Sequence, residues 1–182
     1  MARIIAGQLK GRRLSAVPGN GTRPTSDRVK ESLFSRLEGY NAIDDAVVVD
    51  LFAGSGALGL EAFSRGARSV EAVDLAESAY RVLVKNTALT DGAASAHKAP
   101  ALRYLNARNG APIELLFVDP PYDLPEHELH KVLAAAAPQL DPAATVVVER
   151  DAGSPEPGWP DALECFHQKT YGSTRIWLAE LG

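Results

Sequence analysis

The feature that most constrains the fold is a glycine-rich segment, residues 50–59, between a predicted buried strand and a predicted helix. The strand is the apolar run 46–50, and the helix is expected from Ala57 to Arg65, where Gly66 ends it. Glycines at a strand-to-helix turn let the backbone bend sharply and approach a ligand closely. The segment therefore predicts an α/β fold with a ligand site at the end of this strand.

Strands and helices alternate along the rest of the chain. The expected strands are 46–50, 69–74, 94–98, 114–118 and 145–149, and the expected helices are 57–65, 77–89 and 126–137. This alternation with short links predicts a mostly parallel sheet that is covered by helices on both faces. Two further strands, 163–170 and 173–181, are expected to close the sheet as a C-terminal antiparallel hairpin around Tyr171 and Gly172.

Charge is distributed unevenly behind a net value of −4. Residues 1–40 hold eight basic and three acidic side chains, whereas residues 41–182 hold 11 basic and 20 acidic ones. A basic extension on an acidic body favours a nucleic-acid partner for the extension. We expect residues 1–40 and 41–182 to be these two parts of one compact unit.

The basic extension carries its own structural pattern. Two strand-like pieces, 3–7 and 10–14, predict an N-terminal β-hairpin. A helix capped by Thr25 or Ser26 is expected to follow. Its predicted apolar face consists of Val29, Leu33, Leu37 and Tyr40. Off that face, and available to solvent or a ligand, we expect the cations Arg28, Lys30 and Arg36.

Two carboxylates accompany the glycine-rich segment. Asp74 ends the second strand, 20 residues after Gly54, where a carboxylate can accept both hydrogen bonds of a ribose diol. Asp50 ends the first strand, where it would repel a pyrophosphate but can bind the ammonium of S-adenosylmethionine, directly or through water. The glycine spacing also fits a nicotinamide dinucleotide, so these residues alone favour the first cofactor without excluding the second.

A tetrapeptide, Asp119-Pro120-Pro121-Tyr122, follows the strand 114–118 at the carboxyl edge of the sheet. An exocyclic amine of a base is a poor nucleophile, because its lone pair is delocalised into the ring. Asp119 and the Pro120 carbonyl can accept its two N–H groups, and Asp119 can take its proton. Tyr122 offers a ring on which a base can stack. A dehydrogenase has no use for this arrangement, so it favours methyl transfer, for which alignment is the main task.

Four segments, occurring in order, carry a resemblance to a known family: 3–7, 22–34, 50–62 and 119–122. The chain resembles the bacterial 16S ribosomal RNA (guanine-N2)-methyltransferases of the small single-domain type, and residues 23–28 (Arg-Pro-Thr-Ser-Asp-Arg) make the resemblance specific. It implies a Rossmann-like class I S-adenosylmethionine-dependent methyltransferase fold. It also implies methylation of the N2 amine of a guanine in 16S rRNA, on assembled or nearly assembled 30S subunits.

The resemblance also implies roles for individual residues. The cofactor is expected to contact Asp50, Phe52, Gly54, Ser55, Gly56, Asp74 and Ala99. Backbone groups around Ala99 are expected at the adenine, because residues 97–100 lack the acidic or amide side chain that many methyltransferases use there. The expected catalytic residues are Asp119, Pro120 and Tyr122. RNA phosphates are expected at Arg12, Arg13, Arg23 and Arg28, and Arg23, Thr25 and Arg28 are also expected to order the cofactor pocket.

Other classes of function stay open at this point: a DNA adenine-N6 methyltransferase, a nicotinamide-dependent oxidoreductase, and a non-catalytic RNA-binding assembly factor. No metal is expected, because there is one Cys and the pair His127 and His130 lacks further ligands. The longest apolar runs fall far short of the ~18 residues that cross a bilayer, so no membrane partner is expected. Without an export signal, the single Cys fits the cytoplasm, where we expect a monomer.

Overall fold

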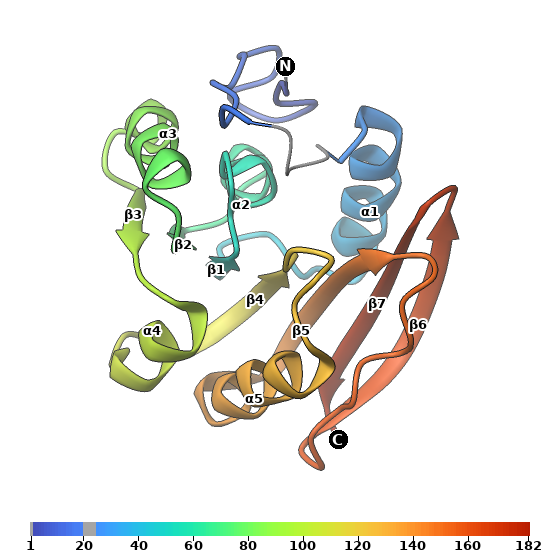
Figure 1. Cartoon of the computed structure of the whole chain (residues 1–182). Coiled ribbons are helices and arrows are strands. Elements are labelled where there is room, and N and C mark those ends of the chain that lie inside the picture. Colours follow the sequence, from blue (N-terminus) through green and yellow to red (C-terminus); the bar gives the residue numbers. More distant parts are fainter. Residues whose placement is uncertain (1, 20–24) are drawn as a thin grey trace.

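The computed structural model describes residues 2–19 and 25–182 and has the expected alternation of strands and helices (Figure 1). The strands are β1 Val47–Leu51, β2 Ser69–Asp74, β3 Ala94–Lys98, β4 Ile113–Val118, β5 Leu140–Asp151, β6 Leu163–Tyr171 and β7 Thr174–Leu181. The helices are α1 Asp27–Gly39, α2 Ala57–Ser64, α3 Glu77–Thr87, α4 Ala101–Ala107 and α5 Glu126–Ala136, with short 3-10 turns at Ala88–Thr90 and Ala137–Gln139. Within the described ranges, no helix has the length and apolar character needed to cross a membrane.

The described strands form one seven-stranded sheet in the order β3-β2-β1-β4-β5-β7-β6. Strands β1 to β5 pair in parallel, whereas β7 runs antiparallel between β5 and β6. The predicted parallel sheet with a C-terminal antiparallel hairpin is therefore confirmed. Strands β2 and β3 lie on one side of β1, and β4 and β5 lie on the other, so the direction of the strand order changes between β1 and β4. At this point Leu51 of β1 lies opposite Val118 of β4. Ligands of open α/β sheets bind at the carboxyl ends of such strands.

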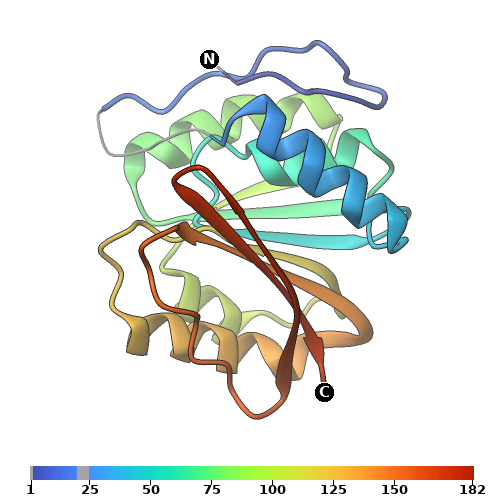
Figure 2. The same ribbon diagram turned by 90° about the vertical axis from the view of Figure 1, so that its right-hand side faces the viewer.

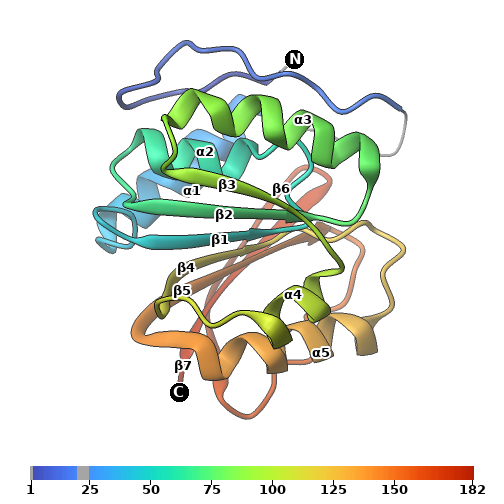
Figure 3. The same ribbon diagram turned by 90° about the vertical axis from the view of Figure 1, so that its left-hand side faces the viewer.

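Helices cover both faces of the sheet, with α1, α2 and α3 on one face and α4 and α5 on the other (Figure 3). Successive strand residues alternate between the two cores: Val48 belongs to the cluster under α1 to α3, and Val49 to the cluster under α4 and α5. By the same alternation, Asp50 points toward the layer of α1 to α3, which places its carboxyl group under α2.

Residues 2–19 lie across the outside of the α2 and α3 layer (Figures 2 and 3). Their two arms pair in an antiparallel manner, as predicted, but only through one bridge, between Arg3 and Arg13. Two full strands do not form, because the backbone between the arms makes turns, with Lys10 N donating to Gly7 O at 3.1 Å. The arms are anchored from below by Ile4 and Leu14, each 1% exposed.

Helix α1 begins at its predicted cap: the Ser26 hydroxyl accepts a hydrogen bond from Val29 N at 3.2 Å. The prediction that Lys30 points to solvent is wrong. Lys30 is fully buried, since its Nζ donates to the Arg3 carbonyl at 2.7 Å and lies 3.7 Å from Glu61 Oε1. The prediction that Tyr40 joins the apolar face is also wrong, because it lies just beyond the helix and is 45% exposed.

Three details of the second half differ from the sequence prediction. Helix α4 was not expected, because only Ala101 and Leu105 of its seven residues are buried, too few to give a clear helical period. Strand β5 begins five residues earlier than predicted, at Leu140. In β6 the register against β7 shifts between Cys165 and His167, so Phe166 is the extra residue of a β-bulge.

Candidate functional site

The glycine-rich turn after β1 has an unusual backbone. Phe52, Gly54 and Gly56 all have positive φ angles, of 57°, 58° and 83°. The positive φ at Gly56 favours glycine, and a Cβ there would lie 2.9 Å from Leu83 Cδ2, so the Leu83 side chain would have to shift. A Cβ at Gly54 would meet no atom within 4 Å. The turn thus presents open backbone at Gly54 to an approaching ligand.

Asp74, at the end of β2, fastens this turn. Its Oδ2 accepts a hydrogen bond from Gly54 N at 2.9 Å, and its Oδ1 accepts one from Ala76 N at 2.9 Å. Each carboxylate oxygen retains a further acceptor position, which a ribose hydroxyl can use. Ala99 lies at the same edge, with its N–H donating to the Asp74 carbonyl at 3.1 Å. Two of the residues expected at the cofactor are therefore neighbours.

Asp50 is 1% exposed, and its Oδ2 accepts a hydrogen bond from Gly59 N in α2 at 2.9 Å. Burial raises the pKa of this carboxyl to about 8, a value that includes the opposing hydrogen bond from Gly59 and the smaller upward effects of the Asp74 and Glu149 carboxylates. The buried carboxyl therefore gives up its proton less readily than an exposed one, and a nearby positive charge would favour its ionised form.

The tetrapeptide follows β4 directly. Asp119 is half-buried, whereas Tyr122 is 80% exposed and free to receive a ring. Desolvation raises the pKa of Asp119 well above its usual range, the carboxylates of Glu149 and Asp50 add to this, and Arg150 opposes it. Because β1 and β4 are neighbours, the structure brings Asp119 to the same edge as the glycine-rich turn.

Sequence reasoning missed Glu149 and Arg150 at the end of β5. The Arg150 side chain is 2% exposed, and its Nη2 donates to the carbonyls of Tyr122 and Leu124 at 3.3 and 3.4 Å. Its Nη1 lies 3.4 Å from Glu126 Oε1 in the first turn of α5. Arg150 therefore fastens the segment that carries Tyr122. Only the parallel register of β4 and β5, which the sequence does not display, could have identified it.

Asn86 connects the N-terminal extension to the glycine-rich turn. Its Nδ2 donates to the carbonyls of Ser55 and Ser15, at 2.7 and 3.1 Å, and its Oδ1 accepts from Ser15 N at 2.9 Å. The side chain is almost fully buried in α3. The Ser55 carbonyl is thus fixed by Asn86 of α3, and Ser55 is one of the residues expected at the cofactor.

The cations expected at RNA phosphates are on the surface. Arg12 and Arg13 lie in the extension, Arg28 lies in the first turn of α1, and all three are exposed. Arg23 lies outside the described residues. Arg3, which is also exposed, pairs with Asp27 at 3.0 Å. In the described ranges, no group of three acidic, His or Cys side chains could hold a metal ion.

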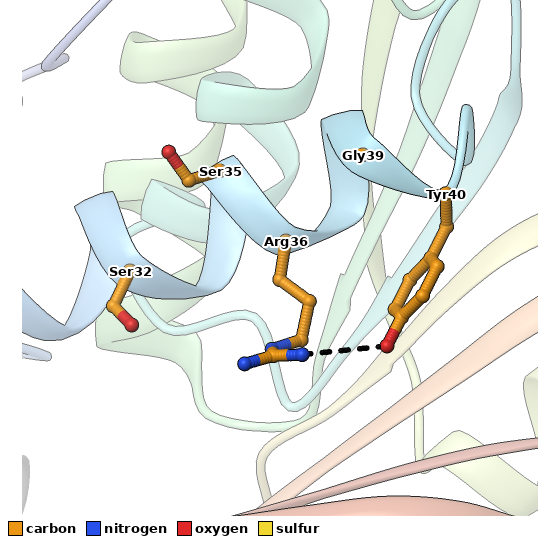
Figure 4. Close-up of a pocket in the computed structure, with 5 residues that line it drawn as sticks. All are labelled: Ser32, Ser35, Arg36, Gly39 and Tyr40. Carbon is orange, nitrogen blue, oxygen red and sulfur yellow. Dashed lines mark hydrogen bonds between the residues drawn. The ribbon is translucent and has the colours of Figure 1, made fainter.

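The described part of the surface includes two open depressions. One is lined by Tyr122, Leu124, Glu126, Arg150 and neighbouring residues, directly beside the tetrapeptide. The other lies along α1, where Figure 4 shows Arg36 between Ser32 and Tyr40, with Nη1 donating to the Tyr40 hydroxyl at 3.4 Å. None of the residues expected at the cofactor or the base lines this second depression.

Comparison with known proteins decides the family. The family model described as Conserved hypothetical protein 95 matches residues 2–180. The chain belongs to this family. Its relatives include Ribosomal RNA small subunit methyltransferase D of Haemophilus influenzae, which is 36% identical over 157 residues, 84% of this chain and 80% of the relative. The expected resemblance to rRNA methyltransferases is thus confirmed.

Other members of the family support the fold. The Escherichia coli protein named Ribosomal RNA small subunit methyltransferase D is 45% identical over 121 residues, and the match spans 66% of this chain but 60% of that protein. The structure of Escherichia coli yhhF superimposes with a TM-score of 0.83 at 35% identity, covering 99% of this chain and 97% of that one. The expected Rossmann-like methyltransferase fold is confirmed.

Proposed function

We propose that the protein transfers a methyl group from S-adenosylmethionine to the N2 amine of a guanine in small-subunit rRNA. The observation that carries the proposal is the position of Asp119-Pro-Pro-Tyr122 at the end of β4, beside the glycine-rich turn after the neighbouring β1. This position supports the proposal, because Asp119 and the Pro120 carbonyl can accept hydrogen bonds from an amine and the exposed ring of Tyr122 can receive a base. We take the proposed rRNA substrate from the names of the relatives, which are ribosomal RNA small subunit methyltransferases.

The residues around the turn fit S-adenosylmethionine. Gly54 offers open backbone, and Asp74 keeps acceptor positions for a ribose diol. Asp50 is nearly inaccessible, which favours a contact with the methionine ammonium through water over a direct one. When bound, the cofactor supplies a methyl group on a positively charged sulfur; N2 forms the new bond while the C–S bond breaks and its electron pair stays on sulfur.

The chain's own residues orient the amine. Asp119 and the Pro120 carbonyl accept the two N2–H groups, which turns the nitrogen lone pair out of the plane of the base. Pro120 and Pro121 have no N–H that would compete for these acceptors. Tyr122, being 80% exposed, stacks on the base. Arg12, Arg13, Arg23 and Arg28 bind phosphates and set the orientation of the RNA.

The direct test is mass spectrometry of nucleosides from 16S rRNA of cells with and without the gene. We expect N2-methylguanosine to fall by one residue per rRNA in the deletion strain, and purified protein with S-adenosylmethionine to restore it. Restoration on 30S subunits but not on naked 16S rRNA is expected for a protein that acts late in assembly. An unchanged amount of N2-methylguanosine would overturn the substrate assignment.

The variant Asp119→Asn tests the proposed role of the tetrapeptide. We expect it to lose methyl transfer while its cofactor affinity, measured by calorimetry, stays within about threefold of wild type, because Asp119 is placed at the amine and not at the ribose. A DNA substrate methylated at adenine N6 would favour the DNA methyltransferase alternative. Binding of NAD in place of S-adenosylmethionine would favour an oxidoreductase.

A further inference from the structure

Glu149 is a buried carboxylate beside Asp119 for which the proposed reaction has no assigned use. In the parallel pairing of β4 with β5, Val118 lies opposite Val148. Asp119, which directly follows β4, is therefore near Glu149 of β5, and the Glu149 charge acts on the Asp119 carboxyl. Both follow residues that point to the α4 and α5 face, and they therefore turn toward α1. Glu149 is only 8% exposed.

Thr25, which lies just before α1, donates a hydrogen bond to the Glu149 carboxylate. Its hydroxyl donates to Glu149 Oε1 at 3.1 Å and to Oε2 at 3.2 Å, in a single shared hydrogen bond. Thr25 is not needed to cap α1, because Ser26 does so. The contact joins residues that are 124 positions apart and connects the start of α1 to the edge that carries the tetrapeptide.

The charged groups around Asp119 come from two neighbouring strands. Glu149 and Arg150 belong to β5 and Asp50 to β1, and among the described residues these are the charges that act on the Asp119 carboxyl. Burial raises the pKa of Asp119 most, and of the three charges Glu149 adds the strongest effect in the same direction. Burial also raises the pKa of Glu149, and the hydrogen bond from Thr25 opposes that shift. A carboxylate of raised pKa is a stronger base toward an amine that becomes acidic during methyl transfer.

We propose that Glu149, held by Thr25, is a positioning residue that keeps its carboxyl group beside Asp119 and keeps Asp119 aimed at the target amine. This inference rests on the proposed function. In the proton step, the N2–H bond that breaks leaves its electron pair on nitrogen and gives its proton to an Asp119 oxygen. Glu149 makes that transfer more favourable, and the hydrogen bond from Thr25 restrains the Glu149 carboxylate and disfavours its protonation.

The first test is a titration that needs no RNA. Aspartate carboxyl carbons are labelled with 13C, the Asp119 signal is assigned with Asp119→Asn, and the protein is titrated with S-adenosylmethionine bound. Glu149→Gln keeps the shape and can still accept from Thr25, but it removes a like charge. We expect the pKa of Asp119 to fall in this variant, and an unchanged titration curve would overturn the inference. The exposed Glu164→Gln is the matched control and should change nothing.

The second test is the pH profile of single-turnover methyl transfer at saturating cofactor and rRNA. Because the pKa of Asp119 falls in Glu149→Gln, its carboxylate form persists to lower pH, so the acid limb moves to lower pH. The plateau rate is expected to fall at the same time, because the base is weaker. A lower plateau without movement of the acid limb would indicate a merely structural role and would overturn the inference.

Thr25 variants complete the test and do not remove a charge. Thr25→Val is expected to lower the plateau rate by roughly threefold to tenfold, the usual net effect of losing one hydrogen bond, and Thr25→Ser should restore it. Equal rates for all three side chains would contradict the role of Thr25. If wild type makes no N2-methylguanosine, the proposed function fails, whereas the carboxyl titration still decides the inference about Glu149.

Discussion

The attachment of the N-terminal extension depends on one buried carboxylate, Glu61 in α2. Its side chain is fully buried and accepts hydrogen bonds from Ile5 N at 2.9 Å and Ala6 N at 3.1 Å. Arg65 Nε donates to it at 2.9 Å, and Lys30 Nζ lies at 3.7 Å. Two backbone donors and two buried cations therefore share a single acceptor group.

Replacing Glu61 by Ala should be severely destabilising. The change leaves Lys30 and Arg65, which are 1% and 3% exposed, without their common counter-charge. Breaking a buried pair by removing one partner costs about 3–5 kcal/mol. The lost hydrogen bonds to Ile5 and Ala6 form part of this cost and should not be added to it. We expect the free energy of unfolding to fall by that amount.

Urea unfolding monitored by circular dichroism measures the change, with the m-value checked for two-state behaviour. Hydrogen exchange should also show that the amides of Ile5 and Ala6 lose protection. The matched control is Glu31→Ala, which removes an exposed partner of the same Arg65, 3.4 Å away, and should cost under about 1 kcal/mol. A loss below about 1 kcal/mol for Glu61→Ala, with protected Ile5 and Ala6, would refute the reasoning.

Three further predictions concern the site. Gly56→Ala forces a side chain into positive φ and should lower the free energy of unfolding by about 1–3 kcal/mol and weaken S-adenosylmethionine binding in calorimetry; unchanged affinity would contradict the fit. Arg12→Ala with Arg13→Ala should lower the log–log salt slope of RNA binding by about two, and an unchanged slope would exclude the extension from phosphate contact. Arg150→Gln should raise KM for rRNA more than it lowers kcat, because it loosens the segment of Tyr122; a pure kcat loss would count against this.

The sequence was sufficient to predict the sheet and its functional edge because their signals are local. Apolar runs of four to six residues mark parallel strands, and glycines at a strand-to-helix junction mark a turn with positive φ. Asp50 and Asp74 lie at the carboxyl ends of their strands and Asp119 directly follows one, so the parallel order alone brings them to one edge. No knowledge of side-chain packing was needed.

The errors have a different origin. Lys30 was placed in solvent because a lysine on a helix is usually exposed, whereas its burial depends on Glu61, 31 residues further along the chain. Glu149 was missed because its neighbour Asp119 lies in another strand, and only the register of β4 and β5 brings the two together. Pairings of this kind depend on tertiary contacts, and one sequence does not reveal them.

The bulge at Phe166 has a consequence for the outer edge of the sheet. Strand β6 is the edge strand at one end of the described sheet. A long, flat edge strand can pair with another chain and start aggregation. The extra residue interrupts the regular spacing of backbone donors and acceptors, and Phe166 packs edge-to-face against Tyr40 with ring centroids 5.6 Å apart. Lys169 adds a charge further along the strand. An irregular, charged border of this kind keeps a nine-residue strand from serving as a template for a neighbouring molecule.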